Sequence, residues 1–243
     1  MNKKTKAFLS MLFMSLTFYM MIETTYVNAV GDYVIEFIGL KSWTGNYTGT
    51  HLTIYYFMPL FIIGIILVKK YAIHDLKIKW KIVIIVFIGL NTIFALSTEA
   101  IAKNIKANSE GLLSIGLEQE DSNHMEYEFK DGKYTKFTAD IKLTNYSKED
   151  KQFHLVIDNK YLRNPIRLYN LDGSRAIFKL KGEETKMFSI NLDNYLVKDG
   201  NINKNDYGNV AGSGDITGVI IFDDRDDEVK IDNNNFFGIS LKK

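Results

Sequence analysis

The sequence of 243 residues contains no cysteine. This absence excludes disulfide bonds, thiol nucleophiles and cysteine-ligated metal sites. A domain of this chain that lies outside the cell must therefore be held together by its hydrophobic core alone. The many lysine, asparagine and isoleucine residues in a cysteine-free chain indicate a bacterial cell-envelope protein.

The chain also lacks a large net charge, which is +1 overall. This balance hides an asymmetry, because residues 1–103 carry ten lysines and five acidic residues, whereas residues 104–243 carry twenty basic and twenty-four acidic residues. Neither part is strongly basic away from the apolar runs. The composition therefore argues against a nucleic-acid-binding surface.

Motifs of common catalytic sites are missing as well. The sequence has no Gly-x-Ser-x-Gly, no His-Glu-x-x-His and no pair of histidines at ligand spacing. His124 and His154 are isolated, and we expect His154 to point to the solvated face of its strand. The sequence therefore predicts a protein that is not an enzyme and holds no cofactor.

What is present is a set of three apolar runs near the N-terminus. The first, residues 7–22, follows a lysine-rich start and is slightly short for a membrane span. Residues 1–30 are therefore either a first transmembrane helix or a signal peptide cleaved after Ala29, where small residues fit signal peptidase. The second and third runs are long enough to cross a bilayer, which predicts transmembrane helices at residues 51–69 and 82–103.

Lysine placement predicts the orientation of these spans. The 31–50 connection holds only Lys41, whereas five lysines lie between or beside the second and third runs: Lys69, Lys70, Lys77, Lys79 and Lys81. Because positive residues stay in the cytoplasm, residues 70–81 form a cytoplasmic loop and residues 31–50 an extracytoplasmic one. The chain is then a multi-pass cell-membrane protein whose residues 110–243 lie outside.

Residues 110–243 change to a period of two, which is typical of β-strands. Polar and apolar residues alternate over 135–144, and Asp131-Gly132 marks a tight hairpin before them. We expect 135–144 to pair with 153–157. Seven or eight short strands predict an all-β antiparallel sandwich of immunoglobulin-like architecture. The predicted strands are 112–117, 125–129, 135–144, 153–157, 176–180, 187–192, 216–222 and 237–241.

The connection before the second run has a possible structure of its own. Residues 31–49 fit an interfacial helix followed by a glycine-rich turn, or else an ordinary connecting loop. In the helical alternative Val34, Phe37, Ile38 and Leu40 would face lipid or the sandwich.

Two polar segments of the predicted sandwich are candidate sites. The first is an acidic turn whose carboxylates could bind Ca²⁺, or which is a solvated hairpin turn; it contains Asp223, Asp224, Asp226, Asp227 and Glu228. The second is the loop 198–215, a possible binding loop in which Tyr207 and Asn209 are the contact candidates, or else an ordinary polar loop.

Polar residues near the predicted spans are the remaining candidates. Glu23, His51 and Glu99 are expected at similar depth near the outer boundary of the bilayer. A histidine between two carboxylates could relay protons or bind a metal, although each residue is close enough to a helix end for its side chain to reach water. Asn91, deeper in the third run, is expected to hydrogen-bond to a neighbouring helix.

These features predict a membrane-anchored cell-envelope protein whose extracytoplasmic sandwich binds or supports another envelope component. The expected partners are the lipid bilayer and a membrane or envelope protein. The alternative is a small accessory subunit of a transporter or channel complex, because two or three spans are too few to form a pathway alone.

Overall fold

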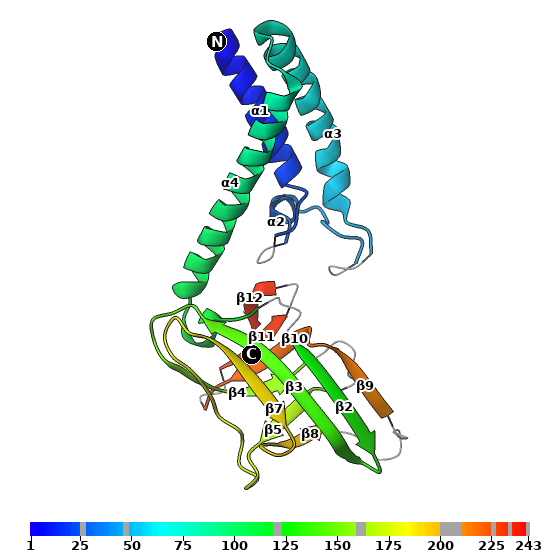
Figure 1. Cartoon of the computed structure of the whole chain (residues 1–243), viewed down its shortest axis with the longest axis vertical. Coiled ribbons are helices and arrows are strands. Elements are labelled where there is room, and N and C mark those ends of the chain that lie inside the picture. Colours follow the sequence, from blue (N-terminus) through cyan, green and yellow to red (C-terminus); the bar gives the residue numbers. More distant parts are fainter. Residues whose placement is uncertain are drawn as a thin grey trace. The chain divides into compact units, whose positions relative to one another are not determined.

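The computed structural model describes residues 1–24, 28–45, 49–118, 123–158, 164–199, 210–224, 227–232 and 235–241. The chain divides into two compact units, Met1–Ile101 and Ala102–Lys243, which we call the helical unit and the β unit. Figure 1 follows the chain through both, from blue helices to red strands.

The described residues of the helical unit form four α-helices, the last of which continues into the β unit. Two of the described helices, Leu52–His74 and Trp80–Ala107, are long and apolar enough to cross a membrane, and they coincide with the second and third apolar runs. The helices are α1 (Lys3–Tyr19), α2 (Val30–Phe37), α3 (Leu52–Val68), which extends as a π-helical segment over Lys69–His74, and α4 (Trp80–Ala107).

Small and aromatic residues hold α1 against the other helices of this unit. Gly64 of α3 comes so near α1 that an added Cβ would lie 2.8 Å from the Cα of Met14. The Phe18 ring packs 5.2 Å from the ring of Phe61 on α3 and 5.0 Å from that of Phe87 on α4, centre to centre. The packing of α1 against α3 and α4 therefore depends on close backbone approach at a glycine and on contacts between aromatic rings.

Gly64→Leu is expected to destabilise the helical unit. A leucine side chain has no room beside Met14, so α1 and α3 must separate, and overpacking of this kind costs about 1–3 kcal/mol. The measurement is the midpoint of thermal unfolding in mild detergent. Gly89→Leu on α4 is the matched control, because no described atom outside the helix backbone lies within 4 Å of the Cβ it would gain. Equal midpoints for the two variants would contradict the packing described here.

The β unit consists of short antiparallel strands. The described residues form twelve of them, more than the seven or eight predicted. Two of the four unpredicted strands, Ile166–Tyr169 and Leu196–Asp199, are too short to leave an alternating pattern. They are β1 (Ile115–Leu117), β2 (His124–Lys130), β3 (Lys133–Asn145), β4 (Lys151–Ile157), β5 (Ile166–Tyr169), β6 (Phe178–Leu180), β7 (Thr185–Asn191), β8 (Leu196–Asp199), β9 (Val210–Asp215), β10 (Gly218–Phe222), β11 (Glu228–Asp232) and β12 (Asn235–Ser240).

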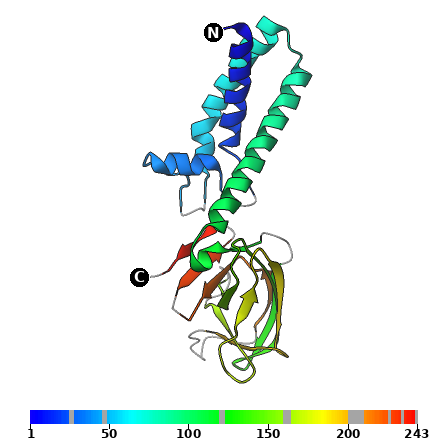
Figure 2. The same ribbon diagram turned by 90° about the vertical axis from the view of Figure 1, so that its left-hand side faces the viewer.

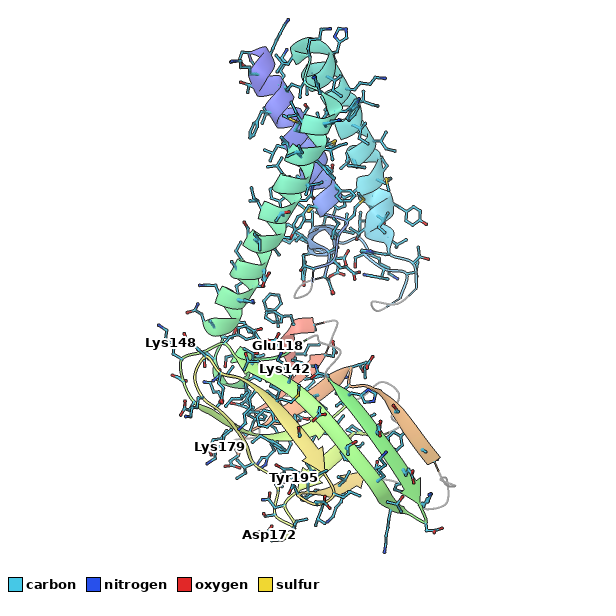
Figure 3. The ribbon with its side chains drawn as sticks, in the orientation of Figure 1. Glu118, Lys142, Lys148, Asp172, Lys179 and Tyr195 are labelled. Atoms are coloured by element: carbon cyan, nitrogen blue, oxygen red, sulfur yellow. The ribbon has the colours of Figure 1, made fainter. Side chains whose placement is uncertain are left out.

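These strands form two sheets that share one core. The first sheet has the order β1-β3-β2-β9, with β7 also paired to β3, and the second has the order β12-β11-β10-β4-β5-β8, with β6 also paired to β4. Phe137 and Ile141 from the first sheet and Phe153 and Ile221 from the second belong to a single buried cluster. At its margin the ring of Tyr195, labelled in Figure 3, stacks 5.7 Å from the ring of Phe178. The arrangement is a sandwich-like pair of antiparallel sheets.

The clearest local signals of the sequence are confirmed. Asp131 and Gly132 both have positive φ and connect β2 to β3 as a two-residue hairpin turn. Within β3 every second residue from Phe137 to Leu143 is buried, as the alternation predicted. The turn after Asn145 is also present, since β3 ends there and β4 begins at Lys151.

The predicted pairing of 135–144 with 153–157 is wrong. β3 pairs with β1, β2 and β7, whereas β4 pairs with β10, β5 and β6. The connection from β3 to β4 therefore crosses from one sheet to the other. Both strands bury apolar side chains in the shared core, and strands facing each other across a core produce the same alternation as neighbours in one sheet.

The predicted loop 198–215 is partly strand. Residues 210–215 form β9, which pairs with β2 along six residues, and residues 198–199 belong to β8. Hydrophobic patterning missed β9 because its sequence, Val-Ala-Gly-Ser-Gly-Asp, has almost no apolar side chains. Backbone hydrogen bonds do not need them, and Gly212 lets the Tyr127 ring lie so close that an added Cβ would be 2.7 Å from it.

Candidate functional site

The carboxylate of Asp32 has several hydrogen-bond partners among the described residues of the helical unit. Asp32 lies in the first turn of α2 and its side chain is buried. His51, the residue before α3, places Nε2 2.6 Å from Asp32 Oδ1. The hydroxyl of Thr53 donates to the same oxygen at 2.5 Å, and the indole N–H of Trp43 donates to Oδ2 at 3.2 Å. We call these four residues the Asp32 cluster.

The Asp32 cluster connects three segments that are separate in the sequence. It joins α2, the chain after α2 and the start of α3, and the rings of Trp43 and His51 stack with 4.3 Å between their centres. A buried carboxylate is stable only when donors satisfy its oxygens, and here three side chains do so. The hydroxyl of Thr53 donates to Asp32 and not to His51, so the group lacks the hydroxyl–imidazole–carboxylate order of a nucleophilic triad.

The structure brings together part of the predicted Glu23, His51 and Glu99 group. His51 Nδ1 lies 4.0 Å from Glu23 Oε1, which makes an ion pair when the imidazole is protonated. The carboxylate bonded to His51 is that of Asp32, which sequence reasoning missed. Glu99 lies on α4. The available signal was the position of Asp32 three residues before Ile35, which places both on one buried helix face.

Asn91 behaves differently from the expectation. Its side-chain amide donates to the carbonyl oxygen of Phe87, one turn earlier in α4, at 2.8 Å. The predicted bond to a neighbouring helix is not made by this donor. A side-chain amide can donate to the carbonyl four residues earlier in the same helix. The Asn91 Oδ1 atom, in contrast, is buried without a hydrogen-bond partner among the described residues.

A cavity of about 270 Å³ lies beside the Asp32 cluster. The hydroxyl of Ser42 donates to the Glu36 carboxylate within it. The wall carries one acidic, one basic and one indole group together with hydroxyls, and its lining residues are Glu36, Leu40, Lys41, Ser42, Trp43, Thr44 and Gly45.

The β unit has a cavity of about 260 Å³ around His154, with Gln152, Ile177, Asp223 and Asp224 in its wall. His154 is 7% exposed, so the prediction that it points to the solvated face was wrong. Its Nδ1 donates to the Ala176 carbonyl at 2.8 Å, and Nε2 lies 3.2 Å from Asp224 Oδ1. Because Nδ1 donates to the Ala176 carbonyl, Nε2 is the nitrogen that faces Asp224 and the cavity.

The acidic turn after β10 closes largely on itself. The backbone N–H of Asp227 donates to Asp223 Oδ1 at 3.1 Å, and the N–H of Asp223 donates to the Asp227 carbonyl. Glu228 begins β11 opposite Phe222, and Asp226 lies outside the described residues. Among the described residues no three histidine or acidic side chains converge as ligands for a metal ion.

Tyr207 and Asn209, the contact candidates of the predicted binding loop, lie outside the described residues. The strand that follows them, β9, is described and forms an edge of the first sheet.

Lys106 is a buried cation that sequence reasoning did not single out. It lies in the β unit, three residues beyond the predicted span 82–103, and its side chain has no exposed surface. Its Nζ donates to the Phe237 carbonyl at 3.0 Å and lies 5.4 Å from the centre of the Phe236 ring. Desolvation by burial lowers the pKa of the Lys106 ammonium from 10.5 to about 7. This amine ties the last turn of α4 to β12.

Comparison with protein families, curated proteins and solved structures finds no match to this chain.

Proposed function

We propose that the chain is a membrane-anchored cell-envelope protein whose β unit, outside the membrane, binds or supports another envelope component. The observation that carries this proposal is the surface of the two long apolar helices. Only 17% of the most apolar window of Leu52–His74 and 6% of that of Trp80–Ala107 are buried within the protein. Apolar helices with so little buried surface are suited to a lipid environment, because exposed apolar side chains cost free energy in water.

Membrane insertion, the orientation and the immunoglobulin-like likeness of the β unit are parts of this proposal. The lysines at 69–81 favour a cytoplasmic connection between the two spans and an outer location for both 31–50 and the β unit. The cytoplasmic part is then a short loop, and any signal that passes inward requires a partner.

The contact surface proposed for the partner includes the His154 cavity. Asp223 and Asp224 give its wall negative charge, and Ile177 beside them is 52% exposed. An exposed apolar side chain next to carboxylates is suited to a basic, partly apolar segment of another envelope protein.

Chemical crosslinking in intact cells followed by purification in mild detergent tests the partner. We expect the full chain to bring down one or a few envelope proteins, and a variant lacking residues 110–243 to lose them while remaining in the membrane fraction. A full chain that purifies alone, with and without crosslinking, would overturn the binding role.

The alternative, an accessory subunit of a transporter or channel, is favoured by the Asp32 cluster at the start of α3. Ionisable residues beside membrane spans often line ion or proton routes. This alternative expects His51→Ala to alter ion or solute flux in cells, whereas the binding role expects loss of function on deletion of residues 110–243.

A further inference from the structure

The direction of α2 differs from that of the other helices in the helical unit. Figure 2 shows α2 lying across the ends of α1 and α3 and not alongside them. Gly31 permits this crossing, because its N–H donates to the Met20 carbonyl at 3.0 Å and an added Cβ would be 2.3 Å from that oxygen. If α3 crosses a bilayer, a helix set across its outer end runs along the membrane surface.

The two faces of α2 have different surroundings. Gly31, Asp32 and Ile35 are buried on the inner face. On the outer face Phe37 is 91% exposed, and Val34 and the following Ile38 are exposed as well. A short helix with one apolar outer face and one polar, anchored face has the pattern of an interfacial helix.

Aromatic side chains near the start of α3 are exposed as well. Tyr55 in the first turns of α3 is 68% exposed, and Tyr56 beside it is exposed too. Tyrosine is enriched at the level of lipid headgroups, because its ring is apolar and its hydroxyl can hydrogen-bond to water. Exposed apolar side chains on α2 and exposed tyrosines on α3 argue that lipid, rather than another protein segment, covers the outer face of α2.

The cavity beside the C-terminal end of α2 supplies polar groups at the same level. Glu36 offers a carboxylate, which accepts a hydrogen bond from the hydroxyl of Ser42, and Lys41 offers an ammonium. The Trp43 indole, held by Asp32 and stacked on His51, is a rigid aromatic wall. A carboxylate with an indole attracts an ammonium ion, and a lysine with hydroxyl groups attracts a phosphate.

We propose that α2 lies in the outer membrane–water interface and that this cavity binds the headgroup of a zwitterionic phospholipid with a primary ammonium, a phosphoethanolamine. Its ammonium is held by Glu36 and Trp43 and its phosphate by Lys41 and Thr44. The inference rests on the proposed membrane anchorage. A purely anionic headgroup would leave Glu36 facing a phosphate, and a trimethylated headgroup could not donate a hydrogen bond to Glu36.

Fluorescence of Trp43 tests the position of α2. The chain has two tryptophans, so Trp80→Phe leaves Trp43 as the single reporter in the full-length protein. In lipid nanodiscs we expect stronger quenching by lipids brominated near the headgroup end of the acyl chain than by lipids brominated near its methyl end. Quenching by aqueous iodide alone would overturn the interfacial position. If the protein still pellets with membranes in that case, the anchorage stands and only this inference fails.

Native mass spectrometry of the full chain in detergent, with phosphatidylethanolamine, phosphatidylcholine or phosphatidylglycerol added, tests the headgroup. We expect preferential retention of phosphatidylethanolamine, reduced roughly tenfold in the E36Q/K41Q double variant by loss of two charge-assisted contacts. K179Q, at an exposed lysine of the β unit labelled in Figure 3, is the matched control and is expected to bind as the parent does.

Three outcomes would overturn the headgroup assignment. Equal retention of the three lipids would show a site without headgroup chemistry. Full retention by E36Q/K41Q would move the binding elsewhere. Equal binding of soluble glycerophosphoethanolamine to the parent and to the double variant would separate headgroup recognition from this cavity.

Discussion

Lys106→Met is expected to stabilise the β unit at low pH and to destabilise it at high pH. Below pH 7 the folded protein must hold a buried ammonium, and the variant removes that cost. Above pH 10.5 the amine is neutral in both folded and unfolded chains, and the variant only loses the hydrogen bond to Phe237, worth about 1 kcal/mol. The variant should therefore be more stable than the parent at low pH and less stable than the parent at high pH.

The slope of stability against pH follows from the direction of this pKa shift. Between pH 7 and 10.5 the unfolded chain binds more protons at Lys106 than the folded chain does. The free energy of unfolding of the parent therefore rises with pH across this window, by about 1.4 kcal/mol per pH unit. The methionine variant should lack this component.

The chain contains no native cysteine, so a single introduced thiol can report the unfolding of the β unit. Ala176→Cys places a single thiol at a buried position of the β unit, and pulses of a maleimide after equilibration in urea report the unfolded fraction. The pulse is given at one fixed pH after equilibration at each test pH. Identical pH profiles for the parent and Lys106→Met, both carrying the reporter, would contradict the buried-ammonium account.

Phe153→Ala is expected to lower the free energy of unfolding of the β unit by about 3–5 kcal/mol. Phe153 is 1% exposed, and its ring lies 6.2 Å from those of Phe178 and Phe188, which come from opposite sheets. Removing it opens a cavity at the centre of the shared core. The same thiol-labelling assay measures the loss.

Leu171→Ala is the control for this prediction. Leu171 is 59% exposed, so its truncation should change stability by no more than about 0.5 kcal/mol. If Phe153→Ala had as small an effect as Leu171→Ala, the two sheets would not share the core described here.

Local chemistry explains which parts of this fold the sequence predicted. Asp131-Gly132 required positive φ in a two-residue turn, and the alternation over 135–144 matched one buried strand face. The long apolar runs predicted α3 and α4 because the few polar residues in them leave the mean hydropathy high enough for a membrane span. These signals are contained within a few consecutive residues, so no distant contact was needed to read them.

Contacts between distant residues explain the errors. His154 was assigned to the solvated face, but its Nδ1–H donates a hydrogen bond to the Ala176 carbonyl, 22 residues later, at a buried position. Asp32 was not singled out, because His51 and Thr53, which bond to its carboxylate, lie 19 and 21 residues away in the sequence. β9 has no side-chain pattern, and only the free edge of β2 makes it a strand.

The sequence by itself determined the two long apolar helices, the β-rich C-terminal part and the hairpin at Asp131-Gly132, because hydrophobicity, period and turn chemistry are local properties. Tertiary structure decided which sheet each strand joins, how α2 turns across α1 and α3, and why Asp32 and Lys106 are buried. The free energy of burying a carboxylate or an ammonium depends on donors, acceptors and rings that only the folded chain brings to them.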